Sequence, residues 1–470
     1  MPANILLIHS DQHRYDCLGV NGHPLVRTPN LDALAAQGMN FTHAFTPAPI
    51  CQPARASLLT GQWPSRHRLI CNPGTEAGGC MADDVVTFSQ VLKEAGYTLG
   101  FVGKWGVSSR RTPLDLGFSY VCFESEYRRW REAQGIPAPP ATNAWFGEVD
   151  PYITPEQSRL AWGADRVIAF LREHAHKGRP FFLRWDPSEP HLPNVVPEPY
   201  ASMYDPAQIE PWPSFDERFV GKPYIQRQQL VSWGIANWSW DDWRPIVQRY
   251  LGEITLLDAQ IGRVLAALDE LGLAEETLVV YTCDHGDMCG AHRMIDKHYV
   301  MYDDVVRVPL IARWPGRIRP GSVGDAFVCT GLDLARTFCE VAGVEAPASF
   351  QGLSLIPVFE GRANGRESIF SVYYGNQFGL YSQRMVRTRR WKYVWNPTAE
   401  DELYDLETDP AELVNRCGDP ACAPQLQALR RLLVDWLEAT EDPLLNGWTR
   451  RQLLEGMKIG PIDSGFGLSR

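Results

Sequence analysis

Four short apolar runs that end in polar or ionisable residues limit the fold of this chain more than any other feature of its sequence. The four runs are residues 5–8, 98–102, 181–183 and 277–281. The polar residues that follow them in the chain are Asp11 and Gln12, then Lys104, then His191, then Asp284 and His285. Apolar runs that alternate with helical patterns are typical of a mostly parallel α/β sheet. Because the carboxyl ends of parallel strands lie along one edge of the sheet, where ligands bind, we expect these polar residues to meet in one site.

The rest of the chain predicts helices on this sheet and a second, smaller domain. Residues 31–38 predict a short packing helix, and residues 246–271, with apolar spacing near 3.6, predict a long amphipathic helix that covers the sheet. Close-set strand patterns at residues 369–374, 383–387 and 391–395 predict a small antiparallel sheet, and the helical pattern at residues 424–440 predicts a helix on one face of it. We therefore predict an α/β domain over residues 1–362 and an α+β domain over residues 363–470, with the boundary within 360–366.

Charge and composition argue against two classes of partner. The net charge is −11 and no basic run stands out, whereas a nucleic-acid-binding protein needs clustered Lys and Arg. No apolar run approaches the roughly 18 residues of a membrane span, and the N-terminus lacks the features of a signal peptide. The 11 cysteines are odd in number and lack metal-knuckle spacing, which favours reduced thiols and a cytoplasmic protein.

The segment PICQPARASLLTGQWPSRH, residues 49–67, places a thiol at the start of a predicted helix. Pro53 suits the first helical position, and Gly61 suits the helix end. Cys51 would then lie at the positive end of the helix, which favours negative charge, with Arg55 on the same side. A lone cysteine is more often a small buried hydrophobe than a nucleophile, so this segment alone leaves both interpretations open.

The pattern Cys-x-Pro-x-Arg followed by Leu59-Thr60-Gly61 resembles the signature of the sulfatase family, within the alkaline-phosphatase superfamily. Further sulfatase-like landmarks follow in family order over nearly the whole chain, at Asp11-Gln12, residues 28–32, Gly103-Lys104-Trp105, Pro190-His191, residues 284–287 and residues 403–406. A match in several segments is far more specific than one motif. The resemblance implies an alkaline-phosphatase-like catalytic domain and a C-terminal domain that completes the substrate pocket. It also implies that a formylglycine-generating maturation enzyme converts Cys51 to formylglycine, an aldehyde that works as its hydrate.

The resemblance further implies one divalent cation, with ligands from Asp11, Gln12, Asp284, His285 and the modified Cys51. Two carboxylates and an amide oxygen suit Ca²⁺, whereas the nitrogen of His285 suits Mn²⁺ or zinc better. We therefore expect Ca²⁺, with Mn²⁺ as the alternative. Many sulfatases carry a second Asp where this chain has Gln12. The Asp-Gln and Asp-His pairs look more like those of choline sulfatases and phosphonate monoester hydrolases.

Four basic residues receive catalytic or substrate-binding roles from the same resemblance. Arg55 and Lys104 would hold the nucleophile and balance charge, and Lys297 would bind a sulfate oxygen. His191 would protonate the leaving alcohol, since imidazole titrates near neutral pH. Each role has an alternative. His191, between prolines, could hold its own loop, and the neighbours of Lys297 could take its role, namely His292, Arg293, Asp296 and His298.

Other residues near these motifs have structural interpretations as well. We expect His67 to be a structural histidine near the pocket. Five tryptophans fall in a predicted irregular insertion, which they either pack down or extend as a substrate wall, namely Trp212, Trp233, Trp238, Trp240 and Trp243. Gly106 stands where many sulfatases have a histidine, two residues after the lysine. We expect this glycine to leave space beside Lys104 for the extra substituent of a phosphorus ester.

The function implied is hydrolysis of an aryl or carbohydrate sulfate, with the products an alcohol and inorganic sulfate. The alternative is a phosphonate monoester or phosphodiester hydrolase that uses the same nucleophile and metal, and phosphodiesterase activity could also accompany an arylsulfatase. A third hypothesis is an inactive relative that binds metal and a sulfated ligand, but such a protein has no need of the cysteine signature. The expected partners are a small-molecule or saccharide sulfate ester, the maturation enzyme and, as a possibility, further copies of the chain.

Overall fold

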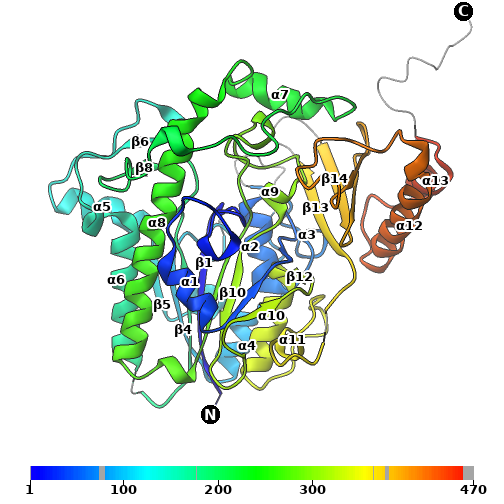
Figure 1. Cartoon of the computed structure of the whole chain (residues 1–470). Coiled ribbons are helices and arrows are strands. Elements are labelled where there is room, and N and C mark those ends of the chain that lie inside the picture. The colour runs from blue at the N-terminus through cyan, green and yellow to red at the C-terminus, as the bar shows by residue number, and fades with distance from the viewer. Residues whose placement is uncertain are drawn as a thin grey trace, which may run out of the picture.

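A mixed, mostly parallel sheet of eight strands forms the centre of the protein (Figure 1). The computed structural model describes residues 2–72, 80–108, 110–175, 177–363, 365–375 and 381–458. The strand order is β11-β2-β10-β9-β1-β7-β4-β5, and β9, β1, β7, β4 and β5 are parallel neighbours. In chain order the strands are β1 (Asn4–Ser10), β2 (Met39–Phe41), β4 (Thr98–Gly103), β5 (Tyr120–Phe123), β7 (Phe181–Asp186), β9 (Thr277–Cys283), β10 (Leu310–Arg313) and β11 (Ser322–Gly324). The predicted α/β sheet is confirmed, with β10 as its antiparallel member against β9 and β2.

The central strand β1 is apolar on both faces because helices cover both sides of the sheet. Ile5 and Leu7 pack into a core with α2 (Cys51–Thr60), α4 (Phe88–Glu94) and α10 (Thr330–Val341). Leu6 and Ile8 pack on the opposite face, whose helices are α1 (Pro29–Ala36), α6 (Arg159–His174) and α8 (Trp240–Glu270). Figure 1 shows α6 and α8 side by side along this second face. Successive side chains of β1 thus point alternately into two hydrophobic cores, one on each face of the sheet.

The long helix begins earlier than its apolar pattern predicts. α8 starts at Trp240, where Ser239 and Asp242 form a reciprocal capping box. Trp240 and Trp243 therefore lie on this helix, and Trp233 is the last residue of α7 (Tyr224–Trp233). The prediction of an irregular insertion is wrong for these three tryptophans, because capping and tertiary packing extend helical structure through the segment.

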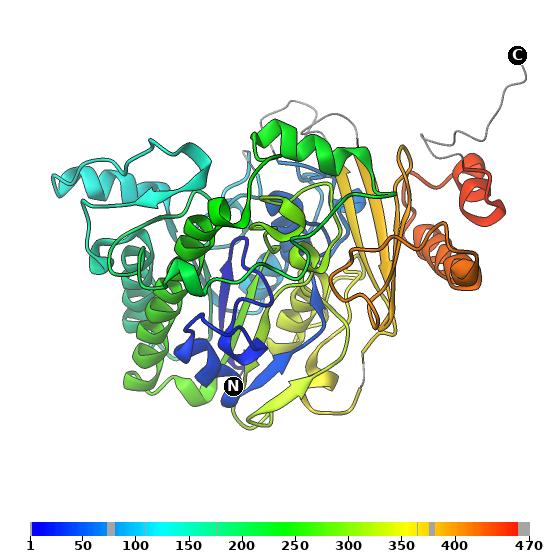
Figure 2. The same ribbon diagram turned by 45° about the horizontal axis from the view of Figure 1, so that its top comes forward.

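The predicted C-terminal sheet and helix are confirmed. The strands β13 (Ile369–Gly375), β14 (Tyr381–Arg387), β15 (Trp391–Trp395) and β16 (Glu402–Asp405) pair antiparallel in chain order. The helix α12 (Ala423–Ala439) packs on them, with the ring of Trp436 stacked on Phe370 at 4.7 Å between centroids. Figure 2 shows this unit at one side of the molecule, with α13 (Gly447–Glu455) beyond it. The boundary within 360–366 stays a prediction. Asn364 and residues 459–470 lie outside the described residues.

Short elements connect these layers. They are β3 (Ala44–Phe45), α3 (Pro64–His67), α5 (Ser125–Ala133), β6 (Glu148–Val149), β8 (Val195–Val196), α9 (Asp303–Val306), β12 (Val328–Cys329) and α11 (Ile356–Phe359). β6 pairs with β8, and β12 pairs with β3. Within the described ranges, no helix combines the length and the apolar character needed to cross a membrane.

Candidate active site

The carboxyl ends of the central parallel strands meet in one buried site. Asp11 follows β1, Lys104 follows β4, Asp186 ends β7 and Asp284 follows β9. Hydrogen bonds and close contacts connect all nine residues that the sequence predicts for the site, namely Asp11, Gln12, Cys51, Arg55, Lys104, His191, Asp284, His285 and Lys297. The expected convergence of distant segments is therefore present in the structure.

Arg55 lies at the bottom of the site and binds three carboxylates. Its Nε donates to Asp284 Oδ2 at 2.9 Å, its Nη2 to Asp11 Oδ2 at 3.0 Å, and its Nη1 to Asp186 Oδ2 at 2.6 Å. The guanidinium is fully buried, which opposes its charge, but the three carboxylates outweigh burial and raise the pKa of Arg55. Since each bond is charge-assisted and directional, Arg55 fixes the orientation of Asp11 and Asp284.

Four side chains beside Arg55 could hold a divalent cation. One ligand atom from each of Asp11, Cys51, Asp284 and His285 lies within 4.8 Å of the other three. His285 Nε2 is 3.8 Å from Asp11 Oδ1 and 3.7 Å from Asp284 Oδ1, and these are the oxygens that do not bind Arg55. Nδ1 of His285 donates to the carbonyl of Gly286 at 2.9 Å, which directs Nε2 into the site. Two carboxylate oxygens and an imidazole nitrogen thus fit a divalent cation.

The protonation of His285 is consistent with a cation site. Burial lowers its pKa, but Asp284 and ionised Cys51 outweigh this and raise the pKa of His285 to about 9. The same negative surroundings would favour a bound cation, whose binding would require the neutral ring.

Gln12 connects the carboxylates to the cations on the open side of the site. Its backbone N–H donates to Asp284 Oδ1 at 3.1 Å, and its Nε2 donates to Asp287 at 2.6 Å and to Asp296 at 3.1 Å. Its Oε1 accepts from Lys297 at 2.8 Å. The backbone of Gln12 is left-handed, with φ of 64°, and such conformations concentrate at functional sites. The role of Gln12 as a metal ligand stays a prediction.

Cys51 is the first residue of α2, as predicted, and is buried in the site. Pro53 is the third helical residue rather than the first, a position whose N–H also lacks a partner within the helix. The Cys51 sulfur lies 3.2 Å from His285 Nε2, 3.7 Å from Asp11 Oδ1 and 4.0 Å from Lys104 Nζ.

The charge around Cys51 separates it from the other buried thiols. Burial and Asp11 oppose its ionisation, but Lys104, Lys297 and His285 hold the pKa of Cys51 well below its usual range. Burial instead raises the pKa of Cys17, Cys283 and Cys289. An inert structural thiol would resemble those three, so the surroundings of Cys51 are those of a reactive residue.

Lys104, Lys297 and His191 form the cationic side of the site. Lys104 Nζ donates to Asp11 Oδ2 at 2.5 Å, and Lys297 Nζ lies 2.6 Å from His191 Nε2. His191 Nδ1 donates to the carbonyl of Leu192 at 2.5 Å, so Nε2 accepts from Lys297. His191 therefore both holds its own loop and directs a nitrogen at the site.

The basic neighbours of Lys297 are engaged elsewhere, whereas Asp296 accepts from Gln12. His292 pairs with Glu217 at 2.8 Å, Arg293 donates to the carbonyl of Ala236 at 2.9 Å, and His298 lies 3.2 Å from Asp296. Lys297 is thus the member of this segment that contacts Gln12 and His191. His67 is fully buried against Ser57, at 3.0 Å, as expected of a structural histidine.

A cavity of about 760 Å³ adjoins the site, and Lys104 and His191 are part of its wall. The wall also includes residues of α5, α6 and α8 and of the loop after β7. The five tryptophans considered as a substrate wall are absent from the described residues that line this cavity. Their contacts favour packing instead. Trp212 lies under the guanidinium of Arg14, at 4.1 Å, and Trp238 packs edge-on against Trp243.

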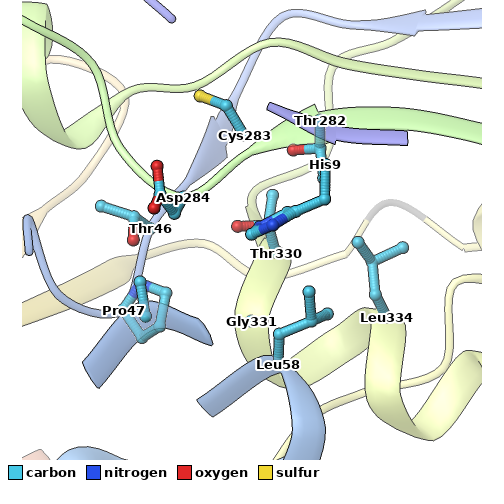
Figure 3. A pocket seen from close by; sticks show the side chains of 11 residues that line it. His9, Thr46, Pro47, Leu58, Thr282, Cys283, Asp284, Thr330, Gly331 and Leu334 are labelled. Carbon is cyan, nitrogen blue, oxygen red and sulfur yellow. The ribbon is translucent and has the colours of Figure 1, made fainter. Parts of the chain in front are cut away.

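Behind the site, the sheet and two helices pack without room for water (Figure 3). Side chains from β1, α2 and α10 surround a narrow gap there, including His9, Leu58 and Leu334, with Asp284 at its edge. Burial outweighs the attraction of Asp186 and lowers the pKa of His9, so this ring is neutral. A close-packed, dry floor of this kind holds the carboxylates in position.

The expected space at Gly106 is absent. A Cβ added there would lie 3.3 Å from Cδ of Arg55 and 3.8 Å from Cγ of Lys104, and the φ of Gly106 is +50°. A side chain would press on Arg55 in a strained backbone. The glycine therefore allows close approach of the backbone to Arg55, whose side chain occupies the place of the missing one.

Several charged residues of the site were not predicted as site residues, and Asp296 was named only as a neighbour that could take the role of Lys297. Asp186 binds Arg55 and also accepts from Arg184 Nε at 2.7 Å, and Asp287 and Asp296 accept from Gln12. Asp186 follows an apolar run, as Asp284 does, and this position was a usable signal. For Arg184, an arginine inside a buried strand was the signal, because a buried charge needs a partner.

Two family models match the chain. The model described as "Sulfatase" matches residues 3–344, and the model described as "N-sulphoglucosamine sulphohydrolase, C-terminal" matches residues 290–439. Together they cover the central sheet, the site and most of the C-terminal sheet and helix.

Individual proteins are similar over almost the full chain. An arylsulfatase of Clostridium perfringens is 31% identical, over 98% of this chain and 99% of that protein. An N-acetylglucosamine-6-O-sulfatase of Bacteroides thetaiotaomicron is 27% identical, over 93% of this chain and 87% of that protein. The crystal structure of a phosphonate monoester hydrolase of Agrobacterium radiobacter superposes with a TM-score of 0.80 at 27% identity, covering 94% of this chain and 96% of that one.

Proposed function

This chain belongs to the sulfatase family and is a sulfuric ester hydrolase, and we propose that it cleaves an aryl or carbohydrate sulfate with a formylglycine made from Cys51 and one divalent cation. The observation that carries the proposal is the arrangement of Asp11, Cys51, Asp284 and His285, whose ligand atoms lie within 4.8 Å of one another. In this arrangement, a formylglycine at residue 51 and a cation held by the other three residues would face the same substrate oxygens.

The maturation of Cys51 replaces sulfur by oxygen and oxidises Cβ by two electrons, for which a maturation enzyme must supply the oxidant. Once formed, the aldehyde hydrate supplies a hydroxyl nucleophile for the sulfur atom of the ester. A cation bound by Asp11, Asp284 and His285 supplies a Lewis acid that polarises the ester oxygens. Carboxylate ligands favour Ca²⁺, and the imidazole of His285 keeps Mn²⁺ as the alternative.

The protein's own cations bind and orient the substrate in this proposal. Lys104 lines the adjoining cavity and Lys297 lies beside His191, and in this proposal each donates to an oxygen of a sulfate monoanion. Arg55 donates to three carboxylates and to the carbonyl of Lys104, so in this proposal it positions the ligands of the cation. Nε2 of His191 accepts from Lys297 in the structure. In the protonated form, in which both ring nitrogens carry a proton, His191 would pass the Nε2 proton to the oxygen of the departing alcohol and return to the neutral ring.

A second candidate is hydrolysis of phosphonate monoesters or phosphodiesters in the same site. The similarity to the phosphonate monoester hydrolase of Agrobacterium radiobacter favours it, together with the Asp11-Gln12 and Asp284-His285 pairs. These phosphorus esters carry one negative charge, as a sulfate monoester does, so Lys104 and Lys297 suit both. The structure gives no extra space at Gly106 to favour the phosphorus esters.

Matched aryl esters test the proposal. The metal-loaded enzyme, with the modification at residue 51 verified, is assayed with 4-nitrophenyl sulfate, 4-nitrophenyl phenylphosphonate and bis(4-nitrophenyl) phosphate. We expect the sulfate to have the highest kcat/KM and the Cys51→Ala variant to lack activity while it remains folded. A kcat/KM for either phosphorus ester that is orders of magnitude higher would instead support the second candidate.

A further inference from the structure

Two buried acids form part of the cavity wall next to His191. Glu189 lies on the loop after β7, two residues before His191, and Glu253 lies on α8. The two side chains come from segments far apart in the chain, and each residue is only 5% exposed. Among the described residues, the carboxyl groups of Glu189 and Glu253 form no hydrogen bond with a predicted ligand of the cation.

The hydrogen bonds of this pair are incomplete. Glu189 Oε1 accepts from Arg159 Nε at 2.8 Å, but its Oε2 is buried and has no donor among the described residues. Glu253 Oε2 accepts from Asn194 Nδ2 at 2.6 Å. The other ion pair in the wall is complete, because Arg131 binds both oxygens of Asp150, at 2.6 and 3.1 Å. Of the three buried acids among the described residues of this wall, Asp150, Glu189 and Glu253, the last two therefore have hydrogen-bonding capacity left.

The charges near the pair are also unbalanced. One guanidinium, that of Arg159, faces Glu189, Glu253 and the nearby Glu124, and an unpaired buried carboxylate is costly. A proton on Glu253 removes part of the imbalance. Burial, and then the charge of Glu189, raise the pKa of Glu253 to about 8. At neutral pH the pair then offers one carboxylic acid and one carboxylate, which can donate and accept hydrogen bonds.

We propose that Glu189 and Glu253 bind hydroxyl groups on the alcohol portion of the ester, so that the preferred substrate is the sulfate of a sugar or another polyol. The inference rests on the proposed function, because it assigns the alcohol of that same reaction to this cavity. A hydroxyl group donates to a carboxylate and accepts from a carboxylic acid, as this pair requires. An unsubstituted aryl ring would offer no donor to Oε2 of Glu189, which has none among the described residues. The cavity volume of about 760 Å³ falls within the range of roughly 300–1,000 Å³ typical of small-molecule sites.

The test compares three sulfate esters on the metal-loaded enzyme with verified modification: glucose 6-sulfate, 4-nitrophenyl sulfate and 2-aminoethyl sulfate. We expect Glu253→Leu to lower the ratio of kcat/KM for glucose 6-sulfate to that for 4-nitrophenyl sulfate at least tenfold. Glu253→Gln keeps a donor and an acceptor of the same shape, and should restore most of the ratio. Glu132→Leu, at an exposed position of the same wall, is the control and should leave the ratio as in wild type.

Glu189→Gln provides a second test if Glu253→Leu does not fold, and it should also lower the ratio, because it replaces an acceptor by a donor. An unchanged ratio in folded Glu189→Gln and Glu253→Leu would overturn the inference. An equal fall of the ratio in Glu132→Leu would also overturn it. A wild-type preference for 2-aminoethyl sulfate over glucose 6-sulfate would also overturn it, because two ionised acids would then bind an ammonium group. Failure of the proposed function is distinguishable, since wild type would then hydrolyse none of the three esters.

Discussion

Arg55 Nε donates to Asp284 Oδ2 at 2.9 Å. Since Arg55 lies one turn after Cys51 in α2 and Asp284 directly follows β9, this bond joins the helix to the strand end. The same guanidinium binds Asp11 and Asp186, so one side chain ties together the ends of three parallel strands. The positions of the predicted cation ligands depend on it.

We predict that Arg55→Leu abolishes activity and destabilises the fold by about 3–5 kcal/mol, because it leaves three buried carboxylates without their partner. Arg55→Lys keeps the charge but cannot reach three carboxylates in fixed directions, and should retain little activity. Denaturant unfolding and the bound-metal content measure both effects. Arg66→Leu removes an exposed pair with Glu441 and is the control, with an expected change below about 1 kcal/mol. Equal effects at Arg55 and Arg66 would contradict this account.

Removal of one cation ligand should remove both metal and activity. Asp284→Asn lowers the ligand charge, so we expect elemental analysis to find less than a tenth of the wild-type metal and the assay to find no turnover. Asp269→Asn, at the exposed end of α8, should retain both. Reconstitution of the chelated wild type with Ca²⁺ or Mn²⁺ identifies the preferred ion. Full activity after verified metal removal would refute the cation site.

The role of His191 predicts a dependence on the leaving group. His191→Ala should lower kcat/KM for an alkyl or sugar sulfate by roughly 10²–10⁴-fold, because an alkoxide needs a proton to depart. The loss with 4-nitrophenyl sulfate should be much smaller, since nitrophenolate is a stable leaving group. Equal losses on both substrates would mean that His191 positions its loop or Lys297 and transfers no proton.

His67 predicts a pH dependence of stability. Burial lowers its pKa to about 3, well below the 6.5 of an exposed histidine, so the unfolded chain binds the proton more tightly. The titration of His67 therefore reduces the free energy of unfolding as the pH falls below 6.5, by about 2 kcal/mol between pH 7.5 and pH 5. His67→Gln lacks this titration, so its unfolding free energy relative to wild type should rise by that amount over the same range. A difference that does not vary with pH would contradict the assignment.

The apolar runs allowed four of the eight strands of the central sheet, β1, β4, β7 and β9, and most of the site to be predicted. Asp11, Lys104 and Asp284 were found because each follows a buried strand, and parallel strands bring such positions together. β16 was not predicted as a strand, since Glu402 and Asp405 interrupt its apolar character. Their burial depends on partners from distant segments, such as Gln226 for Glu402.

Other features depend on tertiary contacts that sequence patterns do not contain. Glu253 lies among apolar residues of α8, and its contact with Asn194 brings together two segments far apart in the chain. The failed expectation at Gly106 has a similar cause, because the atoms that fill the space belong to Arg55. A missing side chain in a motif does not by itself show that space is left behind.

The most direct test of the central claim is to measure sulfate ester turnover together with the chemical state of residue 51 in the same preparations. Enzyme made with increasing amounts of a maturation enzyme is digested, and the peptide that contains residue 51 is examined by mass spectrometry. We predict that kcat for 4-nitrophenyl sulfate, per mole of protein, rises in proportion to the fraction of that peptide in which the thiol has become an aldehyde or its hydrate. Full activity in protein that retains the unmodified thiol would contradict the account.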